Sequence, residues 1–285
     1  MTNSGSAAGD ESLRRPNPYP GPRSFRYGER IYGRDLEIDQ LADLMIAERI
    51  MLFYSPSGAG KTSLLEAGLR PRLEQRGFVI APTIRVGHVA PPSLNGAEVR
   101  NRYLLSTLLS LEEDRPPDRQ LGLFELLDID LDGYLAGLDH DQLDPCIFFD
   151  QFEELFTLDP TDQEQKMEFL REVGVALRNR GRWALFSMRE DFIAQLDPYL
   201  HLVPTRFNTR YRLDLLGTSA AETAIRQPAE KIGVRFSEAA ANRLVDDLRR
   251  VRVKRGDAVT EELGPYVEPV QLQVVCRQLW NSVVA

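Results

Sequence analysis

Residues 50–63 read IMLFYSPSGAGKTS, and this stretch carries the strongest signal of the fold. The run Ile50 to Tyr54 is short and apolar, as expected of a buried strand, and the apolar spacing after Thr62 predicts a helix. Between them, Gly58 and Gly60 allow successive backbone N–H groups to curve around an anion, and the positive end of the helix dipole faces the same point. The stretch from Ser55 to Ser63 is therefore predicted to be a phosphate-binding P-loop.

Two side chains of this loop have predicted chemical roles. Lys61 is expected to reach the β- and γ-phosphates of a nucleotide, and the hydroxyl of Thr62 is expected to ligate Mg²⁺. The strict pattern GxxxxGK[ST] starts with glycine, whereas Ser55 stands in that place. The alternative is a simple glycine-containing turn, which would not need a lysine between Gly60 and Thr62. The predicted nucleotide-binding residues of the loop are Ser57, Gly58, Ala59, Gly60, Lys61, Thr62 and Ser63.

A second acidic position follows another buried strand. The apolar run 145–149 ends in Asp150, and the chain continues as Gln-Phe-Glu-Glu. Asp150 is predicted to hold Mg²⁺ through water, and Glu153 is predicted to orient the water that attacks the γ-phosphate. Glu154 is the alternative for that role. A competing interpretation is that this acidic pair merely begins a solvated helix.

An arginine closes the fourth predicted strand, which runs from Trp183 to Met188. Ligands of parallel sheets gather beyond the carboxyl ends of the strands. Arg189 is therefore a candidate to sense the γ-phosphate or to face a neighbouring subunit. The structural alternative is an ion pair with Glu190 or Asp191.

The order of predicted elements indicates the α/β class. Strands are expected at residues 50–54, 78–84, 146–149, 183–188 and 211–216, with helices between them. This alternation predicts a parallel five-stranded sheet with flanking helices, the P-loop NTPase fold. From Thr218 onward helical patterns follow one another and predict a small helical lid domain. The expected domains are an extended or disordered tail at 1–24, a P-loop NTPase core at 25–217 and the lid at 218–285.

The composition of the 285 residues fits a soluble globular protein, since 42% are hydrophobic and 27% are charged. No stretch has the roughly 20 apolar residues of a membrane span, and the N-terminus lacks a signal peptide, so we expect a cytoplasmic protein. The formal net charge of -8 opposes general attraction to nucleic acid. The basic run 249–255 is a local exception that could hold phosphates or an acidic partner, but such runs are usually solvated.

The remaining metal-binding residue types give no site pattern. Cys146 and Cys276 lie in separate apolar runs, which predicts two buried thiols. The three histidines, His88, His140 and His201, show no ligand spacing. Zinc is therefore not expected.

Several segments together resemble the signal-transduction ATPases with numerous domains (STAND), and in particular the bacterial "novel STAND" branch beside the NACHT-type ATPases. The likeness spans about residues 17–281 and rests most on DQFEELF and REDF, which are more specific than a P-loop. The segments that carry it are PNPYPGPRSF, IYGRDLEIDQL, SPSGAGKTSLLEAGLRPRL, FFDQFEELFTL, SMREDFIAQL and YVEPVQLQVVCRQLW.

This resemblance implies a slow Mg²⁺-dependent ATPase that binds ATP or ADP and self-associates on activation. By position in the motifs, it places Gly33 and Arg34 near the adenine, Arg189 in the sensor 1 role and Pro269 of the lid near the base. Members normally carry an effector module and a C-terminal sensor, and neither is present here. We therefore expect one module of a longer signalling or defence protein.

Three other functions stay open at this point. A scaffold that binds ATP or ADP without useful turnover has the same motifs. A GTPase would need an [NT]KxD motif after the fourth strand, and none occurs. A small-molecule kinase would transfer phosphate to a hydroxyl, whereas the run DQFEE better suits an attacking water.

Overall fold

The computed structural model describes residues 16–87, 99–113, 115–139, 145–255 and 258–283. These residues form two compact units. The larger unit spans Phe25–Asp214, and the smaller one combines residues 16–24 with residues 215–283.

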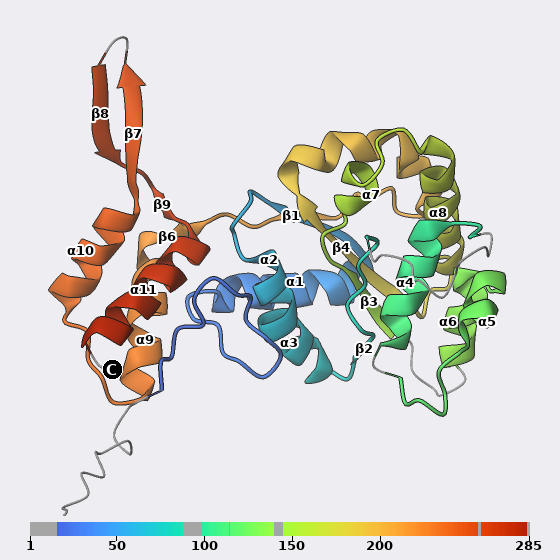
Figure 1. The fold of residues 1–285 in the computed structure, drawn as a ribbon, viewed down its shortest axis with the longest axis horizontal. Coiled ribbons are helices and arrows are strands. Elements are labelled where there is room, and N and C mark those ends of the chain that lie inside the picture. Colours follow the sequence, from blue (N-terminus) through green and yellow to red (C-terminus); the bar gives the residue numbers. More distant parts are fainter. Residues whose placement is uncertain (1–15, 88–98, 114, 140–144, 256–257, 284–285) are drawn as a thin grey trace, which may run out of the picture. The chain divides into compact units, whose positions relative to one another are not determined.

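The larger unit is built on a five-stranded sheet in the order β2-β3-β4-β1-β5 (Figure 1). Every neighbouring pair is parallel. The three central strands are almost wholly buried because their residues form continuous apolar runs, which suit a sheet covered on both faces. The predicted α/β P-loop NTPase fold is confirmed. The strands are β1 Ile50–Ser55, β2 Val79–Ile80, β3 Pro145–Phe149, β4 Trp183–Arg189 and β5 Arg210–Arg212.

Two strands are shorter than the sequence predicts. β2 covers only two residues of the predicted 78–84, because Pro82 has no N–H to donate, and pairing resumes only at a bridge between Ile84 and Phe149. β5 ends at Arg212 rather than at Leu216. Leu216 instead begins β6, Leu216–Gly217, which pairs with β9 in the smaller unit.

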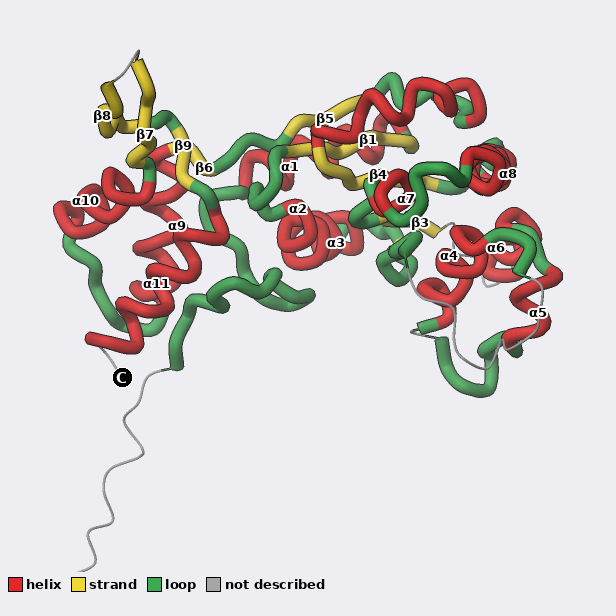
Figure 2. Tube along the Cα trace, turned by 45° about the horizontal axis from the view of Figure 1, so that its top comes forward, coloured by secondary structure: helices red, strands yellow, loops and turns green. Residues whose placement is uncertain are grey.

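Helices flank the sheet of the larger unit in two groups (Figure 2). In one group, α1 Asp35–Glu48 contacts β1, and α3 Arg70–Glu74 contacts β2. The same group contains α2 Lys61–Ser63 and η1 Leu64–Leu69, which join the loop to α3. The other group contains α4 Arg102–Glu112, α5 Leu123–Asp128, α6 Leu131–Asp139 and α8 Gln163–Ala176. Two further elements complete the unit, the short helix α7 Glu154–Thr157 and the 3-10 helix η3 Glu190–Leu202.

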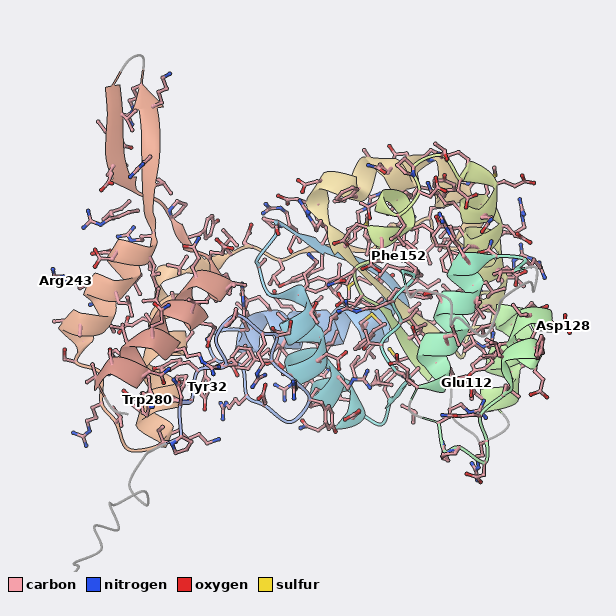
Figure 3. All side chains as sticks on the ribbon, in the orientation of Figure 1. Tyr32, Glu112, Asp128, Phe152, Arg243 and Trp280 are labelled. Carbon is pink, nitrogen blue, oxygen red and sulfur yellow. The ribbon has the colours of Figure 1, made fainter. Side chains whose placement is uncertain are left out.

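Aromatic rings form the core at the carboxyl ends of β3 and β4. The rings of Phe149 and Phe186 stack with centroids 4.7 Å apart, and Phe207 meets Phe186 edge-on at 4.9 Å. Phe152, labelled in Figure 3, completes this cluster at 5.0 Å from Phe186 and is fully buried. Burial of each ring contributes roughly 2–3 kcal/mol. The packing of Phe152 in this cluster fixes the acidic stretch after β3 to the core.

The smaller unit contains strands as well as the predicted lid helices. Its helices are α9 Thr218–Lys231, α10 Glu238–Leu248 and α11 Pro269–Val283, and its strands are β6, β7 Arg250–Arg255, β8 Ala258–Leu263 and β9 Tyr266–Val267. Most of the basic run 249–255, for which a solvated segment was the usual expectation, forms strand β7 of the antiparallel hairpin β7–β8. Its strand neighbours are acidic, as in the Arg255 to Glu262 ion pair at 3.1 Å.

Residues 16–24 pack within the smaller unit, where they contact α9 and α11. The Tyr19 ring is buried against Trp280 at 6.2 Å, and its hydroxyl donates to the Ile225 carbonyl at 2.5 Å. Asn17 donates to the Arg277 carbonyl at 3.1 Å. An extended, proline-rich segment can dock in this way because its side chains, and not a helix of its own, supply the contacts.

Both cysteines are free and fully buried, as the apolar runs around them predict. Burial raises the pKa of the Cys276 thiol to about 12 and that of Cys146 further, so both stay protonated. Among the described residues, no helix has the length and apolar content needed to cross a bilayer.

Candidate functional site

The loop between β1 and α2 has the backbone of an anion-binding turn. Gly58 and Gly60 have φ of 78° and 92°, in the left-handed region that other residues adopt only with strain. Gly60 stands at the N-cap of α2, so the first N–H groups of the helix point into the curve of the loop. Ala59 between them is buried, while Ser57 is exposed at the outer side of the loop. The loop therefore presents backbone donors at a helix N-terminus.

Lys61 lies across this curve and contacts the residue that replaces the first glycine of the motif. Its Nζ donates to Ser55 Oγ at 3.0 Å, and that hydroxyl in turn donates to the Pro56 carbonyl at 2.7 Å. Burial lowers the pKa of Lys61, while the carboxylates of Glu153 and Asp150 act in the opposite direction. The serine thus gives the ammonium group a polar partner at the end of β1.

Asp150 is brought directly against the loop. The Thr62 hydroxyl donates to Asp150 Oδ2 at 2.6 Å, and the Ser187 hydroxyl donates to Oδ1 at 3.0 Å. The aspartate is 1% exposed. It occupies this place because β3 lies beside β4 in the sheet, one strand from β1, and all three end at the same edge.

The turn after Asp150 directs two glutamates to different partners. Gln151 has φ of 54°, and Phe152 N–H donates to the Ser187 carbonyl at 2.8 Å, which ties the turn to β4. Glu153 Oε2 accepts from the backbone N–H of Arg189 at 3.2 Å. The Glu154 carboxylate accepts from the backbone N–H of Gly87, and burial raises its pKa. Glu153 therefore faces β4, and Glu154 faces the segment after β2.

Arg189, at the end of β4, makes the ion pair that the sequence offered as an alternative. Its Nη2 lies 2.6 Å from Asp191 Oδ2, and its guanidinium lies over the Phe192 ring at 5.5 Å. The side chain is 43% exposed, and its charge lowers the pKa of Lys61. The arginine is close enough to influence the loop while it stays accessible.

Arg34 contacts the backbone of the loop. It is 5% exposed, and its Nη2 donates to the carbonyls of Ala59 at 3.3 Å and Asp214 at 2.8 Å. Its Nη1 pairs with Glu37 at 2.6 Å. Gly33 before it has φ of 77°, which turns the chain into α1. The structure thus places Arg34 against the loop backbone, and its predicted proximity to adenine stays a prediction.

Comparison with known proteins gives the family of this fold and site. Residues 18–278 match the sequence pattern of the family described as Novel STAND NTPase 1. The chain belongs to the novel STAND NTPases. The predicted resemblance is confirmed, and the chain is a nucleotide-binding NTPase module.

Two solved structures are similar to this chain, and the first agrees with it at the level of the fold. A Walker-type ATPase of Pyrococcus abyssi is 16% identical with a TM-score of 0.60, and the match covers 91% of this chain and 70% of that one. The ORC2 protein of Aeropyrum pernix, solved as ADPNP and ADP complexes, is 14% identical with a TM-score of 0.47. That match covers 84% of this chain and 65% of the other. Among curated proteins, no sequence matches the chain significantly.

One predicted site residue of this NTPase lies in the other unit. Pro269 begins α11 of the smaller unit, whereas the remaining candidates all belong to Phe25–Asp214. Its contact with a base stays a prediction. Ser63 lies in the larger unit, where its hydroxyl accepts from the Phe25 N–H at 3.1 Å.

Sequence reasoning missed two polar residues around Asp150. Ser187 was passed over inside an apolar strand, although a hydroxyl in a buried strand needs a partner. Arg85 follows the second predicted strand, and its Nη2 lies 3.7 Å from Asp150 Oδ2. The signal for Arg85 was its place at the carboxyl end of a strand, the same signal that identified Arg189.

The oxygen atoms at this edge of the sheet suit a Mg²⁺ ion that is also bound by phosphate. Mg²⁺ prefers oxygen ligands and few protein groups, and Thr62 Oγ1 and Asp150 Oδ2 supply two such oxygens side by side. Within the described part of the chain, no group of three or more His, Cys, Asp or Glu could hold a metal without a ligand.

Proposed function

We propose that this chain binds ATP with Mg²⁺ and hydrolyses it slowly, as the nucleotide-dependent switch of a larger signalling or defence protein. The observation that carries the proposal is the contact of Thr62 with Asp150 beside Lys61. A hydroxyl, a carboxylate and a lysine that meet at a glycine-rich helix N-terminus are the parts that phosphoryl transfer requires.

Each part has a distinct task in this proposal. The loop amides and Lys61 bind the β- and γ-phosphates and hold them in one orientation. Thr62 and Asp150 would hold Mg²⁺, which would offset the charge that develops on the transferred phosphoryl group. Ser187 keeps the Asp150 carboxylate in place through its bond to Oδ1. Arg189, once released from Asp191, would contact the γ-phosphate or the next subunit.

Glu153 is the proposed base that orients the attacking water. Its Oε2 accepts from the N–H of Arg189, which lies opposite Ser55 in the parallel register of β4 and β1, and the Ser55 hydroxyl accepts from Lys61 Nζ. This carboxylate is therefore close to the place of the γ-phosphate. The bond from the Arg189 N–H leaves its other oxygen available for water.

Energy from the nucleotide would be used in a change of conformation. The chain has two compact units joined at Asp214 and Leu215 and again at Ser24 and Phe25. A nucleotide that contacts both units would stabilise one arrangement of them, and hydrolysis would release it. Self-association on activation is part of the proposal, as are effector and sensor modules elsewhere in a longer protein.

The first test is nucleotide binding by Lys61→Ala. The purified wild type is denatured, the released nucleotide is identified, and ATP affinity and phosphate release are then measured. We expect the variant to lose ATP binding by about a hundredfold or more, since it lacks the positive charge that would pair with the phosphates. Lys231→Ala, at an exposed lysine of α9, is the matched control and should bind like the wild type.

Two outcomes would redirect the proposal. Unchanged ATP affinity in Lys61→Ala would defeat the assignment of the loop. Tight binding by the wild type without phosphate release, with and without self-association, would favour a nucleotide-dependent scaffold that does not turn over.

A further inference from the structure

The backbone of Arg85 is fixed directly beside the end of β3. Ile84 forms a parallel bridge with Phe149, and the Asp150 N–H donates to the Ile84 carbonyl at 2.9 Å. Arg85 therefore leaves the sheet next to Asp150, although the two lie 65 positions apart in the sequence.

Helix α4 holds the same residue from the other side. The Arg85 N–H donates to Ser110 Oγ at 3.3 Å, and Ser106 Oγ donates to the Arg85 carbonyl at 2.5 Å. Both serines are nearly inaccessible, with 1% and 2% exposure. Two buried hydroxyls thus serve both polar backbone groups of one residue, which sets the point from which its side chain starts.

The guanidinium group reaches the acidic turn after β3. Its Nη1 donates to Gln151 Oε1 at 2.6 Å, and its Nη2 lies 3.7 Å from Asp150 Oδ2. Gln151 is the residue with the left-handed backbone, a conformation that costs about 1–2 kcal/mol outside glycine. Arg85 therefore contacts the carboxylate and the strained residue next to it. The side chain is 38% exposed, so it can also move.

The charge of Arg85 matters because carboxylates surround the place of the phosphates. Arg85 lies near Asp150, and although burial raises the pKa of the Glu154 carboxyl, the charge of Arg85 acts in the opposite direction. Anionic phosphates are repelled by carboxylates whose charge is not offset by a cation. This repulsion is strong where water is excluded. A divalent cation removes this repulsion. Without one, the Arg85 guanidinium lies 3.7 Å from Asp150 Oδ2 and supplies positive charge there.

We propose that Arg85 is a positioning residue that supplies positive charge beside Asp150 and Glu154 when no divalent cation is bound, so that the site retains nucleotide without Mg²⁺. The inference rests on the proposed function and adds to it a way to stay loaded between turnovers. Arg85 and Mg²⁺ then act as alternatives at Asp150 Oδ2.

The test compares ADP affinity with Mg²⁺ and with EDTA, read from the fluorescence of a methylanthraniloyl-labelled ADP. We expect Arg85→Gln to weaken binding about tenfold in EDTA, equivalent to about 1.4 kcal/mol. In Mg²⁺ the variant should stay within about twofold of the wild type, because the metal ion offsets the same carboxylates. A direct phosphate contact or a general loss of structure would instead weaken binding in both buffers.

Two controls separate charge from shape. Arg85→Lys keeps the charge and should retain most of the affinity in EDTA. Arg100→Gln removes an arginine that pairs with Glu168 at 2.9 Å and Glu172 at 2.7 Å, and it should change neither value. Thermal unfolding of each variant checks that the fold is intact.

The outcomes distinguish this inference from the proposed function. Equal losses in both buffers, no loss in EDTA, or a wild type that binds ADP only with Mg²⁺ would overturn the role of Arg85 and leave the P-loop assignment standing. A wild type that binds nucleotide in neither buffer would overturn both.

Discussion

At the scale of single residues, Asp150 and Glu153 lie three positions apart but differ in burial and in hydrogen-bond partners. Asp150 is buried, and each of its oxygens accepts a hydrogen bond from a hydroxyl, from Thr62 at 2.6 Å and from Ser187 at 3.0 Å. Glu153 is only half-buried and accepts one backbone bond at 3.2 Å. A carboxylate fully engaged with hydroxyls suits a metal ion, and one with a vacant oxygen suits a water molecule.

This difference leads to a prediction for Glu153→Gln. The amide keeps the shape of the side chain but accepts a proton poorly, so ATP should still bind with Mg²⁺ while turnover falls by about a hundredfold or more. Phosphate release under single-turnover conditions, together with ATP affinity, measures both effects.

Glu154→Gln is the matched control, since it makes the same change one residue further on. Its carboxylate faces Gly87 and Arg85, away from the proposed water, and turnover should fall by no more than about threefold. If the two variants exchange their effects, Glu154 is the base.

At the scale of elements, the clearest constraint lies where α8 meets the end of η3. A Cβ atom added to Gly174 of α8 would lie 1.9 Å from the backbone carbonyl oxygen of Leu202. Backbone cannot swing aside as a flexible side chain does, so two elements would have to separate. We predict that Gly174→Ala lowers the free energy of unfolding by about 2–4 kcal/mol, measured by urea denaturation.

The control for this prediction is another helical glycine. A Cβ atom on Gly137 of α6 would meet nothing within 4 Å. Gly137→Ala should therefore stabilise the protein by about 0.5–1 kcal/mol, because alanine favours the helix. A similar loss in both variants would show that close packing at Gly174 is not the cause.

How far the sequence predicts these elements depends on where their information lies. The P-loop and the strands that end in Asp150 and Arg189 are local patterns of apolar runs followed by polar residues, and they were predictable. The hairpin β7–β8 was not, because alternating arginine and valine in Arg250 to Arg255 resembles a solvated charged run until its partner strand is known. Contacts such as Arg85 to Asp150 depend on which strands become neighbours, and spacing along the chain does not contain that information.

Helix caps show the same limit on a smaller scale. Ser237 is a residue type favoured at the N-cap and caps α10, with its hydroxyl accepting from the Ala240 N–H at 3.2 Å. For α8, Thr161 and Glu164 have the spacing of a capping box, but Thr161 is not the cap. Asp162 is the cap and accepts from the Gln165 N–H at 3.2 Å, while Thr161 donates to Asp159. Neighbouring polar residues compete for the same role, and their competition is decided by the turn that precedes the helix.

At the scale of the whole molecule, the proposed switch requires that one nucleotide contact both compact units. The loop residues belong to Phe25–Asp214, and Pro269 belongs to the smaller unit, at the first residue of α11. If the base of the nucleotide contacts Pro269, nucleotide binding must make local unfolding rarer in α11 as well as in the loop. Local opening is measured by the exchange of backbone amide hydrogens.

We therefore predict that MgATP slows amide exchange at two places, in residues 57–64 and in the first turns of α11. At a ligand concentration about a hundred times the dissociation constant, the bound state gains about 2.7 kcal/mol, which is enough to slow exchange about a hundredfold where opening requires release. In Pro269→Ala the protection of α11 should decrease while that of the loop persists, since the phosphates still bind there. Protection confined to Phe25–Asp214 in the wild type would contradict a nucleotide that joins the two units, and the switch would then have to act through the core alone.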